Sequence, residues 1–148
     1  MNYIIYDNIP KIPEDLLTTS VDDIKRLYPD GWKIEHSDVK KYSLHPIVGE
    51  LYDYLSAQFP EYDNFSYQLI LPDVPIHVDS GRIGAINYLI HLGGANVETT
   101  WYNDDTLIDS VVFPDRTWHY VKTDIPHGII NLTDIRVAIT ISVKSEKK

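Results

Sequence analysis

Residues 75–92 read PIHVDSGRIGAINYLIHL, and the predicted fold depends on the pattern in this stretch. Successive side chains of a strand alternate between its two faces, so His77 and Asp79 share one face while Ile76 and Val78 share the other. An imidazole and a carboxylate side by side can both direct lone pairs at a single cation. The stretch therefore predicts a strand that packs on one side and offers two metal ligands on the other.

Apolar and β-branched runs of strand length, separated by turn residues, fill the chain from residue 65 to residue 143. Eight such runs are present: SYQLIL, PIHVDS, GAINYLIHL, NVETTWY, TLIDSVVF, TWHYVKT, HGIIN and IRVAITISV. Eight short strands preceded by helices favour a mainly β fold of the α+β class, built on a cupin-like jelly roll, also called a double-stranded β-helix.

The first part of the chain, residues 1–62, has mostly helical periodicity. PEDLLTTSVDDIKRLYPD contains helix-start signals with Ser20 as a cap, and HPIVGELYDYLSAQFP has one apolar face and ends at Pro60. GWKIEH predicts a short extended piece. We therefore expect one domain over residues 1–148: a helical front packed on one outer face of the jelly roll (65–143), followed by a solvated tail (144–148).

The composition excludes several classes of partner and cofactor. Asp and Glu outnumber Lys and Arg by 22 to 13, so the surface field repels phosphate backbones and nucleic acid is not expected. Cysteine is absent, which excludes disulfides and thiolate metal sites. No apolar run approaches the ~18 residues that span a bilayer, so we expect no membrane partner and a cytoplasmic protein, either a monomer or a homodimer.

Two residues further along the chain complete the candidate site. His127, fifty residues after His77, is the best third ligand, and His119 is the alternative. Arg136 opens the last apolar strand, where a cation is costly unless an anion meets it. Its planar, permanently charged guanidinium matches a carboxylate at two points. The pattern indicates a metal site backed by an arginine that binds a carboxylate-bearing ligand.

The order His77-x-Asp79, then His127, then Arg136 nine residues later resembles the iron(II)- and 2-oxoglutarate-dependent dioxygenase superfamily, in particular its compact bacterial and phage members. The resemblance lies in PIHVDSGRIGAINYLIHL, TTWY and HYVKTDIPHGIINLTDIRVAITISV, within residues 65–143. It implies that His77, Asp79 and His127 hold iron(II) and that Arg136 binds the distal carboxylate of 2-oxoglutarate. Dioxygen then oxidises this co-substrate to succinate and CO2, and a small molecule or a peptide residue is hydroxylated.

Further pocket residues follow from alternation and from position. Ala85, Asn87, Leu89 and His91 are expected on one face of their strand, and Asn87 is the candidate for the 1-carboxylate of 2-oxoglutarate. Two candidate substrate contacts are Arg82, just past the metal motif, and Trp101 in TTWY.

Other interpretations remain open on the sequence alone. The same barrel can serve a cupin-like metal-dependent isomerase or lyase that uses no 2-oxoglutarate, or a non-catalytic jelly-roll binding module. The His77 and Asp79 pair can be a surface pair, and Arg136 can pair with a structural acid such as Asp134 or Asp124.

Overall fold

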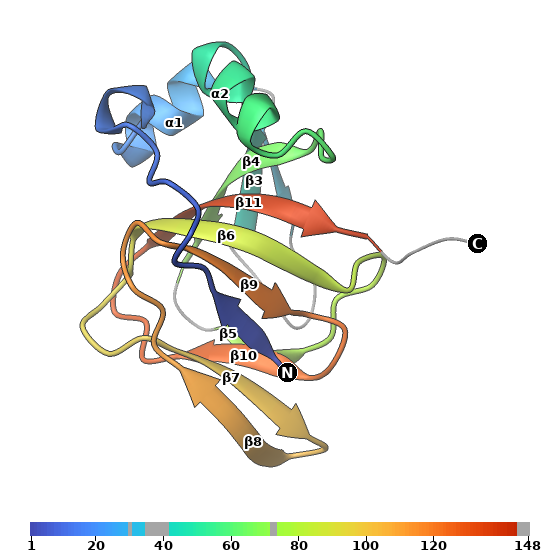
Figure 1. Ribbon diagram of the computed structural model, residues 1–148. Coiled ribbons are helices and arrows are strands. Elements are labelled where there is room, and N and C mark those ends of the chain that lie inside the picture. The colour runs from blue at the N-terminus through green and yellow to red at the C-terminus, as the bar shows by residue number, and fades with distance from the viewer. Residues whose placement is uncertain (30, 35–41, 72–73, 145–148) are drawn as a thin grey trace.

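The protein is described by a computed structural model that covers residues 1–29, 31–34, 42–71 and 74–144 (Figure 1). The last four residues of the expected tail, 145–148, lie outside the described residues. The elements are β1 (Tyr3–Ile5), η1 (Glu14–Leu16), α1 (Val21–Leu27), β2 (Trp32–Ile34), β3 (Tyr42–Pro46), α2 (Glu50–Gln58), β4 (Phe65–Ile70), β5 (Val74–His77), β6 (Gly84–His91), β7 (Glu98–Asn103), β8 (Thr106–Val111), β9 (Trp118–Lys122), β10 (His127–Ile130) and β11 (Arg136–Val143). Within these residues no helix has the length and hydropathy needed to cross a membrane.

The strands form two antiparallel sheets. The larger has the order β1-β9-β6-β11-β4-β3-β2, and the smaller has the order β5-β10-β7-β8. Strands that follow each other in sequence repeatedly fall in different sheets, as in β4 to β5, β6 to β7 and β9 to β10. The chain thus winds back and forth between two layers, and the mainly β, jelly-roll architecture is confirmed.

All eight strands predicted between residues 65 and 143 are present, as β4 to β11. The short extended piece predicted in GWKIEH is present as β2, but the helical front needs a correction, because β1 and β3 also belong to it. These short segments lengthen the larger sheet at both edges: β1 pairs with β9, and β3 pairs with β4 and in turn with β2. An edge strand has unpaired backbone N–H and C=O groups, and the front strands satisfy them.

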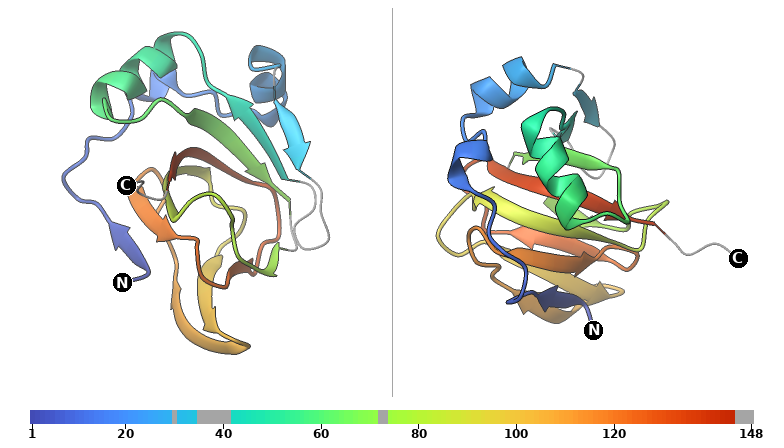
Figure 2. Two further views of the ribbon diagram at one scale, coloured as in Figure 1. Left: turned by 90° about the vertical axis from the view of Figure 1, so that its right-hand side faces the viewer. Right: turned by 45° about the horizontal axis from the view of Figure 1, so that its top comes forward.

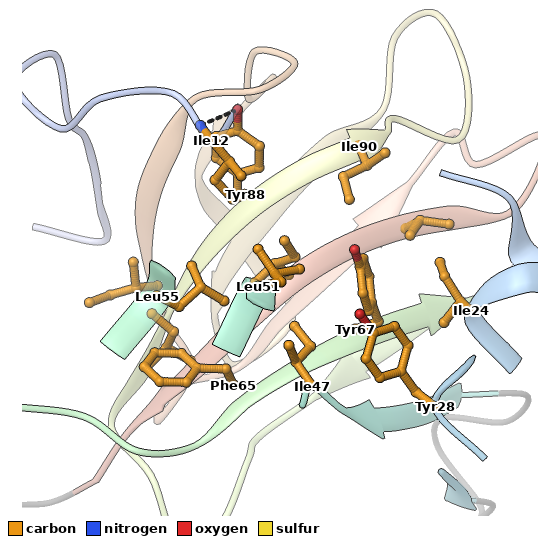
Figure 3. Packing of buried hydrophobic residues seen from close by; sticks show 14 of the residues in the cluster. Ile12, Ile24, Tyr28, Ile47, Leu51, Leu55, Phe65, Tyr67, Tyr88 and Ile90 are labelled. Atoms are coloured by element: carbon orange, nitrogen blue, oxygen red, sulfur yellow. Dashed lines mark hydrogen bonds between the residues drawn. The ribbon is translucent and has the colours of Figure 1, made fainter. Parts of the chain in front are cut away.

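The helices lie on one face of the larger sheet (Figures 1 and 2). Ser20 caps α1 as expected, its side-chain oxygen accepting a hydrogen bond of 3.3 Å from the Asp23 N–H. From α2, Leu51 and Leu55 are buried against the sheet, and the backbone N–H of Ile12 donates to the hydroxyl of Tyr88 on β6 (Figure 3).

Alternation along the strands divides the larger sheet into two chemically different faces. The helix-facing side is apolar and comprises Phe65, Tyr67, Leu69, Ile86, Tyr88, Ile90, Trp118, Val137, Ile139 and Ile141. The residues between them point to the smaller sheet and line a cavity, among them Gln68, Asn87, His119 and Arg136. The same strands therefore build the core under the helices with one set of side chains, and with the other they line a cavity that contains both apolar and polar groups.

Candidate metal centre

Three side chains predicted as metal ligands lie together at the edge of the smaller sheet. His77 ends β5 and His127 begins β10, and the two are direct partners in the antiparallel pairing. Asp79 follows β5 by two residues, and its backbone N–H donates to the Thr123 carbonyl at 3.0 Å. Strand pairing thus brings together two histidines that lie fifty residues apart.

The distances from Asp79 to the two histidines suit one ion. Oδ1 of Asp79 lies 3.3 Å from Nε2 of His77 and 3.8 Å from Nε2 of His127, and all three ligand atoms fall within 4.8 Å of one another. Two donors bound to one ion by bonds of about 2.1 Å are no more than about 4.2 Å apart, so both measured distances fit. His119, the alternative third ligand, is not in this group.

Backbone carbonyls orient both imidazole rings. Nδ1 of His77 lies 2.8 Å from the Pro75 carbonyl oxygen, and Nδ1 of His127 lies 2.8 Å from that of Ile125. A carbonyl only accepts, so each Nδ1 carries the proton and each Nε2 keeps its lone pair. Ligating histidines in metalloproteins make this same outer contact.

The charge states of the group also suit a cation. Burial raises the pKa of Asp79, but its contacts with His77, Arg82 and His127 outweigh that effect, so the pKa lies far below its usual range. Burial lowers the pKa of His127, more than the hydrogen bond to Ile125 raises it. At neutral pH the group therefore presents one carboxylate and a neutral His127, the forms that bind metal.

The cavity beside this group has a volume of about 640 Å³ and is lined by both sheets. Among the described residues that line it, Asp79 is the single acid, whereas Arg82, Arg136 and Lys144 are basic. The chain as a whole has a net charge of −9, so the chamber differs in sign from the average surface. Such a lining attracts anionic ligands.

Arg136 is the most unusual residue of the cavity. Its exposed fraction is 4%, its Nε has no hydrogen-bond partner, and within the described residues it makes no ion pair. Burial alone lowers its pKa to about 10, so it stays a cation at neutral pH. The acids proposed as structural partners are engaged elsewhere: Asp134 accepts from the Ile135 N–H, and Asp124 pairs with Lys122.

Of the other predicted site residues, Asn87 and Arg82 line the cavity and Trp101 does not. Asn87 lines the cavity, and its Oδ1 is buried without a partner among the described residues. Arg82 also lines the cavity, but its guanidinium contacts Asp79 and Ser142. Trp101 is fully buried outside the lining, stacked on Tyr3 with ring centroids 5.7 Å apart, and its indole N–H donates to the Lys122 carbonyl.

Gln68 and Tyr42 are polar lining residues that the sequence pattern was not used to predict. Nε2 of Gln68 on β4 donates to the hydroxyl of Tyr42 on β3 at 2.8 Å, and both face the cavity. The signal for Gln68 was present, because a single amide in the run SYQLIL falls on the face opposite Tyr67 and Leu69. Tyr42 had no such signal, since its strand was not predicted.

His91 was predicted to share the strand face of Asn87 and Leu89, but it does not line the cavity with them. Between β6 and β11 the register shifts, so that Val137 pairs with His91 and Ala138 with Leu89. One extra residue on β6 reverses the alternation beyond it. Nε2 of His91 consequently lies 2.6 Å from the Thr19 carbonyl oxygen, on the side of the front segment.

His119 is expected to make the stability of the protein pH-dependent. Burial, aided by the charge of Arg136, lowers its pKa from 6.5 to about 4 despite the hydrogen bond to Thr117. Between these values the unfolded chain binds a proton that the folded chain does not, so the free energy of unfolding decreases as pH falls from 6.5 to 4. Over this range His119 lowers the free energy of unfolding by about 3 kcal/mol, since each unit of pKa difference corresponds to about 1.4 kcal/mol.

Urea unfolding at several pH values between 6.5 and 4 measures this slope. His119→Phe, which keeps an aromatic ring beside Phe113, is expected to show a shallower decrease than the wild type. Parallel curves for the two proteins would show that His119 titrates normally.

Comparisons with known proteins support the fold. No family model and no curated protein matches the chain. Iron(II) HppE in complex with substrate aligns with 90% of this chain and 64% of its own at 16% identity, with a TM-score of 0.50. Iron(II) HppE with the alternative substrate (S)-1-HPP gives the same coverage at 14% identity and a TM-score of 0.51. Hydroxypropylphosphonic acid epoxidase from S. wedmorenis gives 90% and 63% coverage at 13% identity and a TM-score of 0.48.

This chain spans less than two thirds of the length of those proteins. Identities this low are informative about architecture only. No comparison shows membership of the 2-oxoglutarate-dependent superfamily, so that assignment stays a prediction. What the alignments with the two HppE complexes show is that this chain has a jelly-roll fold of the cupin type.

Proposed function

We propose that the protein is an iron(II)- and 2-oxoglutarate-dependent oxygenase that hydroxylates a small molecule or a peptide residue and releases succinate and CO2. The observation that carries the proposal is Arg136, a buried cation without a described anionic partner, in the same cavity as a His-Asp-His group. A buried charge is costly unless a ligand neutralises it. A co-substrate that reaches both the metal and Arg136 needs an anionic group at its far end, and the distal carboxylate of 2-oxoglutarate is such a group.

In this proposal each residue of the cavity has a separate role. His77, Asp79 and His127 hold the iron, with Nε2, Oδ1 and Nε2 as the ligand atoms. Bound iron(II) supplies the reductive activation of dioxygen, with 2-oxoglutarate as the second source of electrons.

Arg136 binds the distal carboxylate through its fork of N–H groups, and Asn87 binds the carboxylate near the metal. The cavity volume of about 640 Å³ is in the range of small-molecule sites and leaves room for a substrate beside a five-carbon diacid.

An anaerobic binding experiment tests the proposal. Purified protein is mixed with iron(II) and 2-oxoglutarate, and the weak visible charge-transfer band of the chelate is recorded before air is admitted and succinate is measured. We expect a band that needs both additions, followed by slow succinate formation.

Absence of the band and of succinate would contradict the proposal. Oxidation of a substrate without succinate would instead favour an iron(II) oxidase that uses no 2-oxoglutarate. Iron binding with no oxidation at all would favour the isomerase, lyase or binding-module alternatives.

A further inference from the structure

Asp79 belongs to no strand, so something other than sheet pairing must orient its carboxylate. It lies in the segment between β5 and β6, where Gly81 adopts a φ of +85° and the chain turns. Its backbone is fixed by one hydrogen bond to Thr123, but that bond does not set the side-chain torsions. The orientation of a ligating carboxylate usually depends on a hydrogen-bonding partner behind it.

Arg82 provides that partner. Its Nε and Nη2 lie 2.9 and 2.8 Å from Oδ2 of Asp79, the oxygen that faces away from the histidines. Oδ1, the other oxygen, is left to face Nε2 of His77 and Nε2 of His127. The carboxylate is thus divided, with one oxygen held by the guanidinium and the other available for a metal.

Arg82 is itself tied to the larger sheet. Its Nη1 donates to Oγ of Ser142 on β11 at 3.1 Å, and the backbone N–H of Ser142 donates to Oδ1 of Asn64 at 2.6 Å. The next residue, Ile83, donates its N–H to the Val143 carbonyl at 2.9 Å. A continuous set of contacts therefore links the well-paired strand β11 to the metal ligand Asp79.

We propose that Arg82 is a positioning residue for the metal centre, which holds Asp79 with Oδ1 toward the ion and is itself held by Ser142. The inference rests on the metal-binding half of the proposed function and is independent of 2-oxoglutarate. It gives Arg82 a different role from the substrate contact expected on the sequence.

A positioning role and a purely electrostatic role of Arg82 predict opposite changes in metal affinity when Arg82 is replaced. A guanidinium charge near a dication is repulsive, so a purely electrostatic role means that Arg82→Gln binds iron(II) more tightly and that Arg82→Lys is unchanged. A positioning role means that both variants bind more weakly, because lysine keeps the charge but lacks the rigid pair of N–H donors that converge on Oδ2. A substrate role means that neither variant changes metal affinity.

The test is an anaerobic iron(II) titration against a chromophoric chelator, without 2-oxoglutarate, with the melting temperature of each metal-free protein measured in parallel. We expect Arg82→Lys and Arg82→Gln to lower iron(II) affinity by about 10- to 100-fold, as removal of outer-sphere partners does. Ser142→Ala is expected to lower it by a smaller factor, because the contacts to Asp79 remain.

The matched control is Arg116→Lys, since Arg116 pairs with Glu14 and Asp115 outside the cavity. This control is expected to keep wild-type iron affinity. Wild-type affinity in Arg82→Lys, or tighter binding in Arg82→Gln, overturns the inference while leaving the proposed function intact. Failure of the wild type to bind iron overturns both, whereas iron binding without a 2-oxoglutarate band overturns only the proposed function.

Discussion

Asp79→Ala is expected to lower iron(II) affinity by about 100-fold or more and to abolish succinate formation. The carboxylate is the single anionic member of the candidate ligand set, and its Oδ1 lies within 4 Å of both imidazole Nε2 atoms. Loss of an outer-sphere partner alone typically costs 10- to 100-fold, so loss of a direct ligand must cost more. Anaerobic titration with iron(II) measures the change.

Two controls make this result interpretable. Asp124→Ala removes a carboxylate that pairs with Lys122 outside the cavity, and it is expected to leave iron affinity unchanged. Far-UV circular dichroism of Asp79→Ala shows whether the protein still folds after Arg82 has lost its partner. A folded Asp79→Ala protein that binds iron like the wild type would rule out this metal centre.

Arg136→Met is expected to separate co-substrate binding from metal binding. Iron affinity stays at the wild-type value, because Arg136 is not among the ligands, whereas 2-oxoglutarate affinity falls by about 30-fold or more. Loss of one partner from a buried, hydrogen-bonded charge pair costs about 2–5 kcal/mol. Titration of 2-oxoglutarate into the iron(II) protein, followed by the charge-transfer band, measures this loss.

The same variant has a second expected effect, on stability. Arg136 is 4% exposed, and burial lowers its pKa to about 10 without a described anion to offset it. Methionine of similar length removes this buried charge, so the ligand-free variant is expected to unfold at the same urea concentration or a higher one. Arg116→Met, whose arginine is paired with Glu14, should keep 2-oxoglutarate affinity and gain no stability. A joint loss of iron binding and stability in Arg136→Met would show that Arg136 is structural.

The sequence predicted the core strands because they depend on local alternation. Alternation explains the ligand cluster less well, because Asp79 lies two residues beyond the end of β5, and Ile76 and Val78 are exposed instead of packed. His77 and Asp79 lie two residues apart, and the jelly roll brings His127 beside His77 by direct strand pairing. Alternation does place Asn87 and Arg136 in the cavity, since each falls on the inward side of its strand.

The departures have identifiable physical causes. The bulge opposite Val137 depends on the pairing of β6 with β11, which period-two counting does not include, so His91 was placed on the wrong face. Trp101 is covered by Tyr3, and short front strands such as β1 have too few residues for a periodic signal. Tyr42 reaches the cavity from β3, another such strand.

The two-faced strands of the larger sheet also bear on how this protein can change over evolution. On β4, β6 and β11, residues such as Tyr67, Tyr88 and Ile139 secure the helices, whereas Gln68, Leu89 and Ala138 border the chamber. Substitutions in the second group alter the shape offered to a ligand and leave the packing under the helices untouched. The shape offered to a ligand and the packing under the helices can therefore change separately in the same segment of chain, because they depend on alternate residues of a single strand.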